Sequence, residues 1–343
     1  MKKLSLLLIG SCFSILVIGQ AKPSYTQYIL NNYILNPALT GIENYVDVKL
    51  SNRNQWTGID GAPVTTYFTI HGPIGKNDLR TSATSFSVPD ENPRGQKYWD
   101  EYTAPAPHHG LGLNVMNDKA GYINRWSIAA SYAYHIPVAA KSTLAAGLSL
   151  GVNSVNLDRT KIQWANLDPN DPAIGYSTGE LKKVKPEIGA GLWLYSSRYF
   201  LGISVLNIIP GKAQFVKNDK FGTFYTPNYF LTAGYRMALG DQVSFLPSFM
   251  LQYWQPQLTG FHANLKMQYE DLLWLGGSYR YSDLVSGYSA MAGINVSNAF
   301  NVSYSYEVAT TSRLRNYTGN THEIMVGFLI GNKAGDTCPR NIW

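Results

Sequence analysis

The sequence predicts an all-β protein, more specifically a transmembrane antiparallel β-barrel of about fourteen strands. Three observations support this class: a low share of charged residues, a period-two alternation along most of the chain, and connections of two lengths. Only 15% of the 343 residues are charged, and 13% are aromatic. Soluble domains carry about 25% charged residues. The composition therefore indicates an outer surface that faces lipid, with aromatic residues at its boundaries.

Apolar and polar residues alternate in many segments of the chain. In "FNVSYSYEV", Phe300, Val302 and Tyr304 alternate with Asn301 and Ser303. Successive side chains of a strand point to opposite faces, so each such segment has one apolar face and one polar or small face. We expect strands at 45–56, 63–72, 109–118, 125–136, 142–155, 186–196, 198–208, 226–239, 242–255, 258–270, 272–282, 285–296, 299–309 and 320–331. Most of them are long enough to cross a membrane, because a tilted strand needs about 9–11 residues.

The connections between the expected strands test this count. If the chain starts in the periplasm, the short connections "VAAKS", "SR", "GD", "ED" and "SN" fall on the periplasmic side, and the long connections 156–185 and 209–225 fall outside. Short periplasmic turns and longer external loops are typical of such barrels. The Pro-rich connection 73–108 is long and yet falls on the periplasmic side. We interpret it as a periplasmic insertion; a miscounted strand is the alternative.

The two ends of the chain complete the expected domain organisation. Lys2 and Lys3 precede an apolar run of signal-peptide length, so we expect residues 1–21 to be a Sec signal peptide cleaved near Ala21. A lipoprotein signal ending at Cys12 is the alternative, although the apolar run continues beyond that residue. We expect 22–44 to be a periplasmic or plug segment, 45–331 the barrel and 332–343 a C-terminal tail. This organisation places the protein in the outer membrane of a Gram-negative-type cell.

Alternation also selects the charged side chains that face the lumen. These are Asp47, Lys49, Arg236, Lys266, Arg280, Glu307 and Glu323. An unpaired charge in a narrow interior is costly. We therefore expect these residues to form ion pairs or hydrated networks that help to block the lumen, and we do not expect them to catalyse a reaction.

No combination of residues in the sequence predicts catalysis, a metal site or a cofactor. The adjacent histidines His108 and His109 could bind a metal, but adjacent histidines in a Pro-rich stretch are more often solvated. In "THE", His322 and Glu323 face opposite sides of a strand, which argues against an acid–base pair. The chain also lacks a dense block of Lys and Arg, so nucleic-acid binding has little support. We expect a protein that is not an enzyme and that has no cofactor.

The N-terminal region carries two motifs, "QYILNNYILNPALTG" (27–41) and "RNQWTGIDGAPVT" (53–65), and "HGPI" (71–74) follows them. These motifs and their spacing resemble those of the PorP/SprF family of the type IX secretion system. "GLGLNVMNDKAG", "YAYHIPV", "YFLTAGYR" and "THEIMVGFLIG" are similar to later parts of the family pattern. The positions that match its motifs are Asn36, Pro37, Gly41, Arg53, Gln55, Trp56, Gly58, Gly61 and Pro63. These residues either stabilise the start of the barrel or contact a partner.

The resemblance implies a function in protein export. It implies an outer-membrane barrel that assists the secretion or surface attachment of cargo such as gliding adhesins. The implied partners are secretion-system components, outer-membrane lipid and a cargo protein with a C-terminal sorting domain; no small-molecule substrate is expected. One alternative is a fatty-acid-type transporter of small apolar solutes, with the N-terminal segment as its plug. Another is a passive anchor for an extracellular adhesin.

Overall fold

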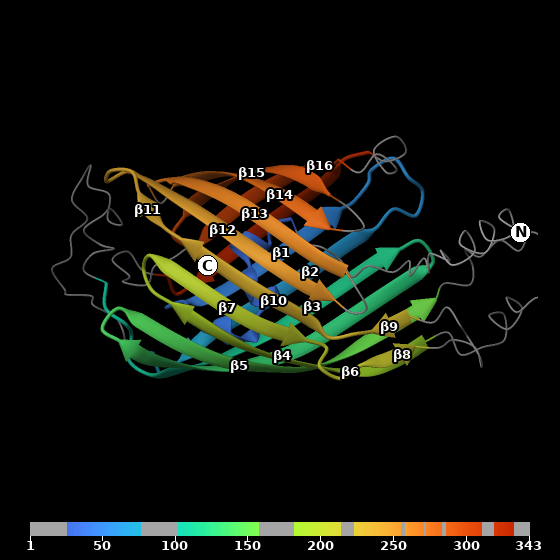
Figure 1. Cartoon of the computed structure of the whole chain (residues 1–343), viewed down its shortest axis with the longest axis horizontal. Coiled ribbons are helices and arrows are strands. Elements are labelled where there is room, and N and C mark those ends of the chain that lie inside the picture. The colour runs from blue at the N-terminus through green and yellow to red at the C-terminus, as the bar shows by residue number, and fades with distance from the viewer. Residues whose placement is uncertain are drawn as a thin grey trace, which may run out of the picture.

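The computed structural model describes residues 26–76, 102–157, 182–213, 223–254, 258–270, 272–282, 286–310 and 319–332 (Figure 1). The described chain begins with three short 3-10 helices, η1 (Tyr28–Leu30), η2 (Asn32–Ile34) and η3 (Pro37–Leu39). The first seven strands are β1 (Val46–Asn54), β2 (Val64–Ile74), β3 (His108–Ala120), β4 (Ile123–Ala139), β5 (Ser142–Leu157), β6 (Lys182–Tyr195) and β7 (Tyr199–Leu206).

The remaining strands follow in chain order. They are β8 (Gly211–Ala213), β9 (Thr223–Tyr225), β10 (Asn228–Tyr235), β11 (Met237–Ala238), β12 (Val243–Trp254), β13 (Leu258–Tyr269), β14 (Leu273–Ser282), β15 (Gly287–Ser297), β16 (Phe300–Ala309) and β17 (Thr321–Ile330). Among the described residues, no helix is long and apolar enough to cross a membrane.

The strands close into an antiparallel barrel. Consecutive strands pair from β1 to β7 and from β12 to β17, β7 pairs with β10, and β10 pairs with β12. β1 also pairs with β17, from Val46↔Ile330 to Asn54↔His322, which closes the barrel. The wall has fourteen strands, β1–β7, β10 and β12–β17. The predicted fold class is therefore confirmed. The expected strand 226–239 is divided into β10 and its short continuation β11, which pairs with β12.

One hairpin was not predicted from the sequence. Strands β8 and β9 pair with each other, outside the barrel sheet, within the connection 209–225 that we expected to be an external loop. Each of them has only three residues. Three residues are too few to produce a recognisable alternation, so the pattern did not reveal them.

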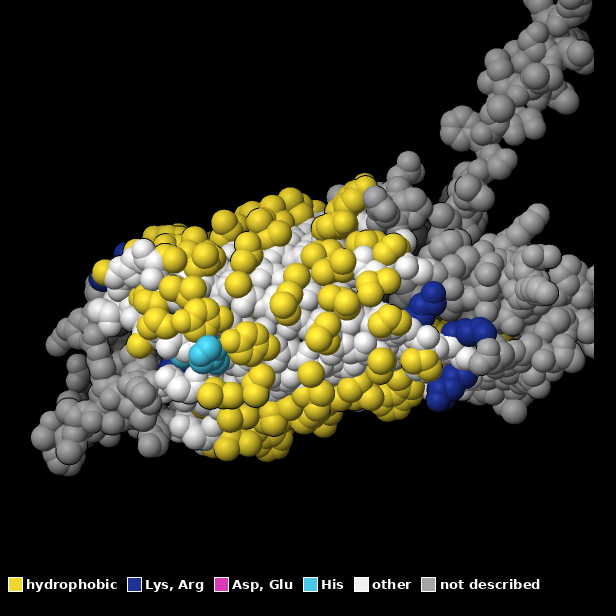
Figure 2. All heavy atoms as spheres, turned by 90° about the horizontal axis from the view of Figure 1, so that it is seen from below, with side chains coloured by type: hydrophobic (Ala, Val, Ile, Leu, Met, Phe, Trp, Pro, Cys, Tyr) yellow, Lys and Arg dark blue, Asp and Glu magenta, His cyan; other side chains and the backbone are white. Residues whose placement is uncertain are grey.

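The two faces of the wall differ in polarity, as the alternation predicts. On β5, Leu144, Leu148 and Leu150 are exposed on the outside, Leu150 by 63%, whereas Thr143 and Ala145 are fully buried inside. Figure 2 shows apolar side chains spread over the outer wall between its two ends. An exposed apolar band of this extent suits hydrocarbon and would be unfavourable in water.

The two rims of the barrel carry different connections. The short-turn rim, as we name it, has the turns 140–141, 196–198, 239–242 and 298–299. The opposite rim, named the long-loop rim, has the connections 55–63, 158–181 and 310–320, together with the short turn 121–122. β2 and β3 pair directly from Val64↔Lys119 to Ile74↔His109, so no strand of the wall is missing between them. Residues 77–101 of the expected insertion lie outside the described part of the chain.

The interior of the barrel is occupied by the chain's own N-terminal segment. Residues 26–45, which we call the lumen segment, run through the interior and carry η1, η2 and η3 (Figure 1). Tyr33, Ala38, Leu39 and Ile42 of this segment form an apolar cluster with Trp193 and other residues of the inner wall. The core of the molecule therefore lies within the lumen, between the lumen segment and the wall.

Candidate functional site

The candidate site consists of the lumen segment and the parts of the wall that hold it. The segment begins beside Glu307 and Glu323, which lie near the long-loop ends of β16 and β17. It ends beside Gly72 and Gly110, which lie near the short-turn ends of β2 and β3. The segment thus spans much of the depth of the barrel, and it contacts the wall at both ends.

The first contact fixes the start of the segment to β17 and β16. The backbone N–H groups of Thr26 and Gln27 donate to Glu323 Oε2 at 2.9 and 3.3 Å. The Thr26 hydroxyl donates to Glu307 Oε2 at 2.7 Å. The Gln27 amide donates to the Glu323 carbonyl oxygen at 2.7 Å and accepts from the Ser303 hydroxyl at 2.5 Å. Both carboxylates therefore hold backbone and side-chain donors of the lumen segment.

The same two carboxylates are balanced by two arginines. Arg53 Nη2 lies 3.1 Å from Glu307 Oε2, and its Nε lies 3.7 Å from Glu323 Oε2. Arg280 makes a second ion pair with Glu307. Arg53, Arg280, Glu307 and Glu323 form the charged anchor, with two positive and two negative side chains, all buried. Burial of charge is tolerated only where the charges are paired and hydrogen-bonded, and this arrangement meets that condition.

The second contact involves the Asn-Pro-Ala motif. Asn36 caps η3, because its Oδ1 accepts from the Ala38 N–H at 2.9 Å, and Pro37 occupies the first helical position. The Asn36 amide also donates to the carbonyl oxygens of Leu192 and Ile203 at 3.0 and 3.3 Å. One side chain therefore shapes the segment and attaches it to β6 and β7.

Glycines of the wall leave the room that this motif occupies. A Cβ atom at Gly147 would lie 2.4 Å from the Pro37 carbonyl oxygen. At Gly191 it would lie 1.9 Å from Asn36 Oδ1, and at Gly110 it would lie 2.0 Å from the Thr40 carbonyl oxygen. Gly110, Gly147 and Gly191 form the glycine cradle. It lies on three strands, and only residues without a side chain allow the backbone of the segment to come this close.

Thr40 and Gly41 continue the contact toward the short-turn rim. Gly41 has a φ of +75°, and a Cβ at this position would lie 2.5 Å from Gly110 Cα. His135 Nε2 donates to the Thr40 carbonyl oxygen at 2.9 Å, and the Gly41 N–H donates to His71 Nδ1 at 3.2 Å. Glycine at position 41 is thus required both by the backbone conformation and by the lack of space.

Buried tyrosines also attach the segment to the wall. The Tyr33 and Ser131 hydroxyls are 2.6 Å apart, and Asn264 donates to the Tyr28 hydroxyl oxygen at 2.6 Å. Both tyrosines are buried, so each hydroxyl depends on the hydrogen bond that it makes to the wall.

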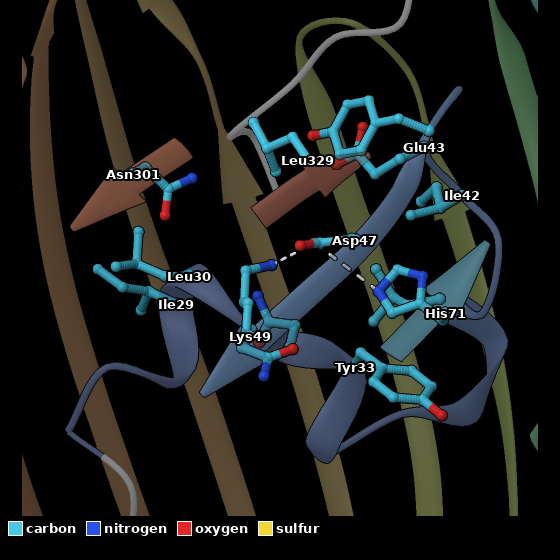
Figure 3. Close-up of a pocket in the computed structure, with 14 residues that line it drawn as sticks. Ile29, Leu30, Tyr33, Ile42, Glu43, Asp47, Lys49, His71, Asn301 and Leu329 are labelled. Atoms are coloured by element: carbon cyan, nitrogen blue, oxygen red, sulfur yellow. Dashed lines mark hydrogen bonds and ion pairs between the residues drawn. The ribbon is translucent and has the colours of Figure 1, made fainter. Parts of the chain in front are cut away.

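The remaining lumen charges lie on the inner face as the alternation indicated. Asp47 forms an ion pair with Lys49, whose side chain is 14% exposed, and His71 Nε2 lies 3.8 Å from Asp47 Oδ2 (Figure 3). These residues line a small pocket between β1, β2 and the lumen segment. Arg236 donates to the Ser244 hydroxyl and to Gln268 Oε1 at 3.0 and 3.4 Å. The Lys266 ammonium lies 5.7 Å from the centre of the Trp274 ring.

The second family motif forms the turn 55–63 after β1. The Gln55 N–H donates to the Pro63 carbonyl oxygen at 2.9 Å, and Gln55 Oε1 accepts from Arg53 Nη1 at 3.0 Å. Gly58 and Gly61 have φ values of +95° and +73°, and Trp56 itself has a φ of +56°. Two of the motif's glycines therefore supply the left-handed backbone of a tight turn.

This turn also contacts the connections on both of its sides. The Trp56 N–H donates to the Thr321 hydroxyl at 3.3 Å, and the Thr57 N–H donates to the Asn320 carbonyl oxygen at 3.1 Å. On the other side, the Gly121 N–H donates to the Gly61 carbonyl oxygen at 2.8 Å. The turn thus extends the seam between β1 and β17, which supports its structural role. Contact with a partner stays a prediction.

Histidines and serines of the wall do not form a catalytic arrangement in the described part of the chain. His108 points inward and stacks on His135 with 4.4 Å between ring centres, whereas His109 points outward to the Tyr132 hydroxyl at 2.7 Å. The described residues contain no group of three or more His, Cys, Asp or Glu side chains that could hold a metal. The stretch Gly147–Gly151 reads Gly-x-Ser-x-Gly, but it lies within β5 and not at a strand-to-helix turn, so it is not a nucleophile elbow.

Comparisons with known proteins identify one family and several similar solved structures. Residues 17–328 match the model of the family described as type IX secretion system membrane protein PorP/SprF. No curated protein matches the chain in sequence. Similar solved structures include the outer-membrane protein Omp33 of Acinetobacter baumannii, with 8% identity over 85% of this chain and 100% of that chain and a TM-score of 0.45.

Two further similar structures are barrels described as a transporter and a channel. The toluene transporter TbuX of Ralstonia pickettii has 12% identity over 88% of this chain and 93% of that chain, with a TM-score of 0.47. The monoaromatic hydrocarbon channel CymD has 14% identity over 90% of this chain and 93% of that chain, with a TM-score of 0.47. The family match, over residues 17–328, covers nearly the whole chain. The protein belongs to the PorP/SprF family of type IX secretion system membrane proteins.

Proposed function

We propose that the protein is a non-enzymatic outer-membrane partner in type IX secretion, which assists the export or surface attachment of a cargo protein with a C-terminal sorting domain. The observation that carries this proposal, beside the family, is the filled lumen. The lumen segment is buried along most of its length and is held near both rims. A barrel of this kind anchors a protein in the membrane and leaves its rims available for partners.

The filled lumen also bears on the alternative of solute transport. A transporter of apolar solutes needs a continuous path through the lumen. Binding sites for small molecules are lined mainly by apolar side chains. The pocket beside Asp47 and Lys49 has a cavity volume of about 30 Å³, which holds little more than water, and its lining is largely polar. Transport through this barrel would therefore require the lumen segment to leave its contacts with the charged anchor and the glycine cradle.

The rims suggest a division of contacts. Under this proposal the connections 158–181 and 209–225 of the long-loop rim meet cargo that has reached the cell surface. The short-turn rim, the insertion 73–108 and the tail 332–343 meet periplasmic components of the machine. The adhesin-anchor alternative differs from this scheme, because a passive anchor needs no periplasmic contact.

Deletion of the gene tests the proposal. We expect the deletion strain to lose one or a few surface proteins from its surface proteome while the uptake of small apolar solutes stays normal. Complementation with the wild-type gene should restore display. Unchanged surface proteins with a decreased uptake of an apolar nutrient would contradict the proposal and support a transporter. Surface display of the cargo that requires only the extracellular side of the barrel would support the passive adhesin-anchor alternative.

A further inference from the structure

A polar row crosses the outer face of the wall near the long-loop rim. The strand pairing aligns Lys119 of β3 with Asn124 of β4, Asn124 with Asn156 of β5, and Asn156 with Lys182 of β6. Both lysines are exposed. Three steps between neighbouring strands separate them, which corresponds to about 14 Å at about 4.8 Å per step. We call these four residues the lysine row.

The lysine row points away from the lumen and toward the surrounding membrane. Lys119 has the same parity on β3 as the exposed Leu111 and Leu113. Lys182 has the same parity on β6 as Val184 and Leu192, which are 58% and 50% exposed. In Figure 2, Lys and Arg side chains gather at the right-hand end of the apolar surface, the end at which β8 and β9 lie in Figure 1.

The row lies at the boundary of the apolar band. The neighbouring aligned layer, toward the middle of the barrel, contains the exposed Trp126 and Val184. Tryptophan favours the level of lipid headgroups, where its ring is partly apolar and partly polar. The next layer outward, that of the lysine row, therefore lies at headgroup depth. The Asn117 amide, in the layer of Trp126, donates to Asn124 Oδ1 of the row at 2.6 Å.

Among the residues that the structure describes, the carboxylates close to the row in sequence, Asp118 and Glu187, point inward and do not neutralise it. Asp118 accepts from the Thr65 hydroxyl at 2.8 Å and lies 3.8 Å from Arg125 in the interior. Glu187 accepts from the Ser127 hydroxyl at 2.6 Å, also on the inner side. On β10–β15, the same rim presents outward-facing tyrosines, namely Tyr229, Tyr253, Tyr281 and Tyr288. The positive charge is thus concentrated on the β3–β6 part of the wall.

We propose that the lysine row binds the phosphate groups of a phosphorylated glycolipid of the outer leaflet. An ammonium group binds phosphate as a point charge, and a basic side chain near an anionic lipid surface adds to the affinity for it. The two lysines match a headgroup that extends over about 14 Å along the wall, and the amides of Asn124 and Asn156 between them can donate to sugar or phosphate oxygens. This site is independent of the proposed role in secretion.

Lipid binding by purified protein tests this site. The full mature chain in detergent would be titrated by native mass spectrometry with bisphosphorylated lipid A, with the same lipid after dephosphorylation, and with phosphatidylglycerol. We expect K119A/K182A to bind bisphosphorylated lipid A about tenfold or more weakly than the wild type, since each basic residue contributes to the attraction. K141A removes an exposed lysine from the short-turn rim and should bind like the wild type.

The controls keep the test decisive. K119R/K182R should retain binding, because it keeps both charges, and heat-dependent gel migration would show that each variant is folded. Equal binding by the wild type and by a folded K119A/K182A variant would overturn the proposal. If the wild type bound the dephosphorylated lipid as tightly as bisphosphorylated lipid A, the role of phosphate would be overturned. If it bound phosphatidylglycerol as tightly as bisphosphorylated lipid A, the choice of a glycolipid would be overturned.

Discussion

Arg53 Nη2 lies 3.1 Å from Glu307 Oε2, and this contact connects the two motifs of the N-terminal region. Arg53 belongs to the motif around Trp56, whereas Glu307 accepts from Thr26 at the start of the segment that carries the Asn-Pro-Ala motif. The guanidinium group therefore balances the carboxylate that holds the lumen segment. The arginine of the second motif thereby stabilises the position of the first motif inside the barrel.

Substitution of Arg53 should destabilise the barrel and loosen the lumen segment. Arg53→Ala leaves Glu323 without its arginine in a fully buried position. Removal of one partner from a buried ion pair typically costs about 3–5 kcal/mol, so we expect a clear decrease in the temperature at which the folded gel band disappears. Asn52→Ala, which changes an exposed neighbour on β1, should leave this temperature nearly unchanged. Equal temperatures for the two variants would show that the charged anchor has no role in stability.

A methyl group in the glycine cradle should displace the lumen segment. In Gly147→Ala the added Cβ would lie 2.4 Å from a backbone oxygen, which cannot move without the segment. Ser131, which the segment covers through Tyr33 and Thr40, offers a reporter as Ser131→Cys in a Cys338→Ser background. We expect this cysteine to resist a soluble maleimide in the parent and to react at least several times faster after Gly147→Ala.

Gly276→Ala is the matched control for the cradle. Gly276 also lies on the wall, but a Cβ there would meet its nearest atom at 3.4 Å, an ordinary contact. The reporter cysteine should stay protected in this variant. Rapid reaction already in the parent would show that the segment does not cover Ser131, and protection in a folded Gly147→Ala variant would show that the cradle does not hold it.

The turn 55–63 offers a test between structure and partner contact. Ile59 and Asp60 are exposed on the turn, and neither side chain takes part in the hydrogen bonds that position it. If the motif stabilises the first hairpin, Ile59→Ser and Asp60→Asn should preserve both folding and the surface display of cargo. Loss of display by a folded Ile59→Ser or Asp60→Asn variant, measured by surface proteomics, would instead identify a partner contact.

The sidedness of the two rims can be measured on intact cells. Tyr122 lies in the turn 121–122 of the long-loop rim, and Lys141 lies in the turn 140–141 of the short-turn rim. In the Cys338→Ser background, Tyr122→Cys should react with a membrane-impermeant maleimide on intact cells. Lys141→Cys should react only after the outer membrane is permeabilised. The reverse pattern would place the short-turn rim outside and would contradict the expected position of the insertion 73–108 in the periplasm.

The strands and the inner face were accessible from the sequence because both depend on a local repeat. Alternation at Phe300–Tyr304 shows which side chains share a face. Closure of the barrel is expected because an open sheet edge would leave backbone groups unpaired in the hydrocarbon of the membrane. The partners of the inward charges were not accessible. Arg53 and Glu307 are far apart in sequence, on two strands that both lie beside β17. Alternation gives the face of a residue but not its neighbours on the other strands of the barrel.

The lumen segment was the harder part to predict. Its three single-turn 3-10 helices are too short to leave a periodic pattern, and most of their shape comes from contacts with the wall. The glycine cradle was likewise missed. Gly110, Gly147 and Gly191 appear as small inward residues of ordinary strands, and their meaning depends on the segment that packs against them. The inward glycines of "GLGL" indicate a close approach of backbone only when the position of the lumen segment is known.

The most direct test of the filled lumen is the conductance of the purified full-length protein in planar lipid bilayers. The lumen segment, its charged anchor and its glycine cradle predict little or no steady conductance through the folded wild-type barrel. Heat-dependent gel migration of the same sample would show that the inserted protein is folded. A large, steady conductance of the wild-type protein would contradict the account, because it would require an open path through the lumen that the segment 26–45 occupies.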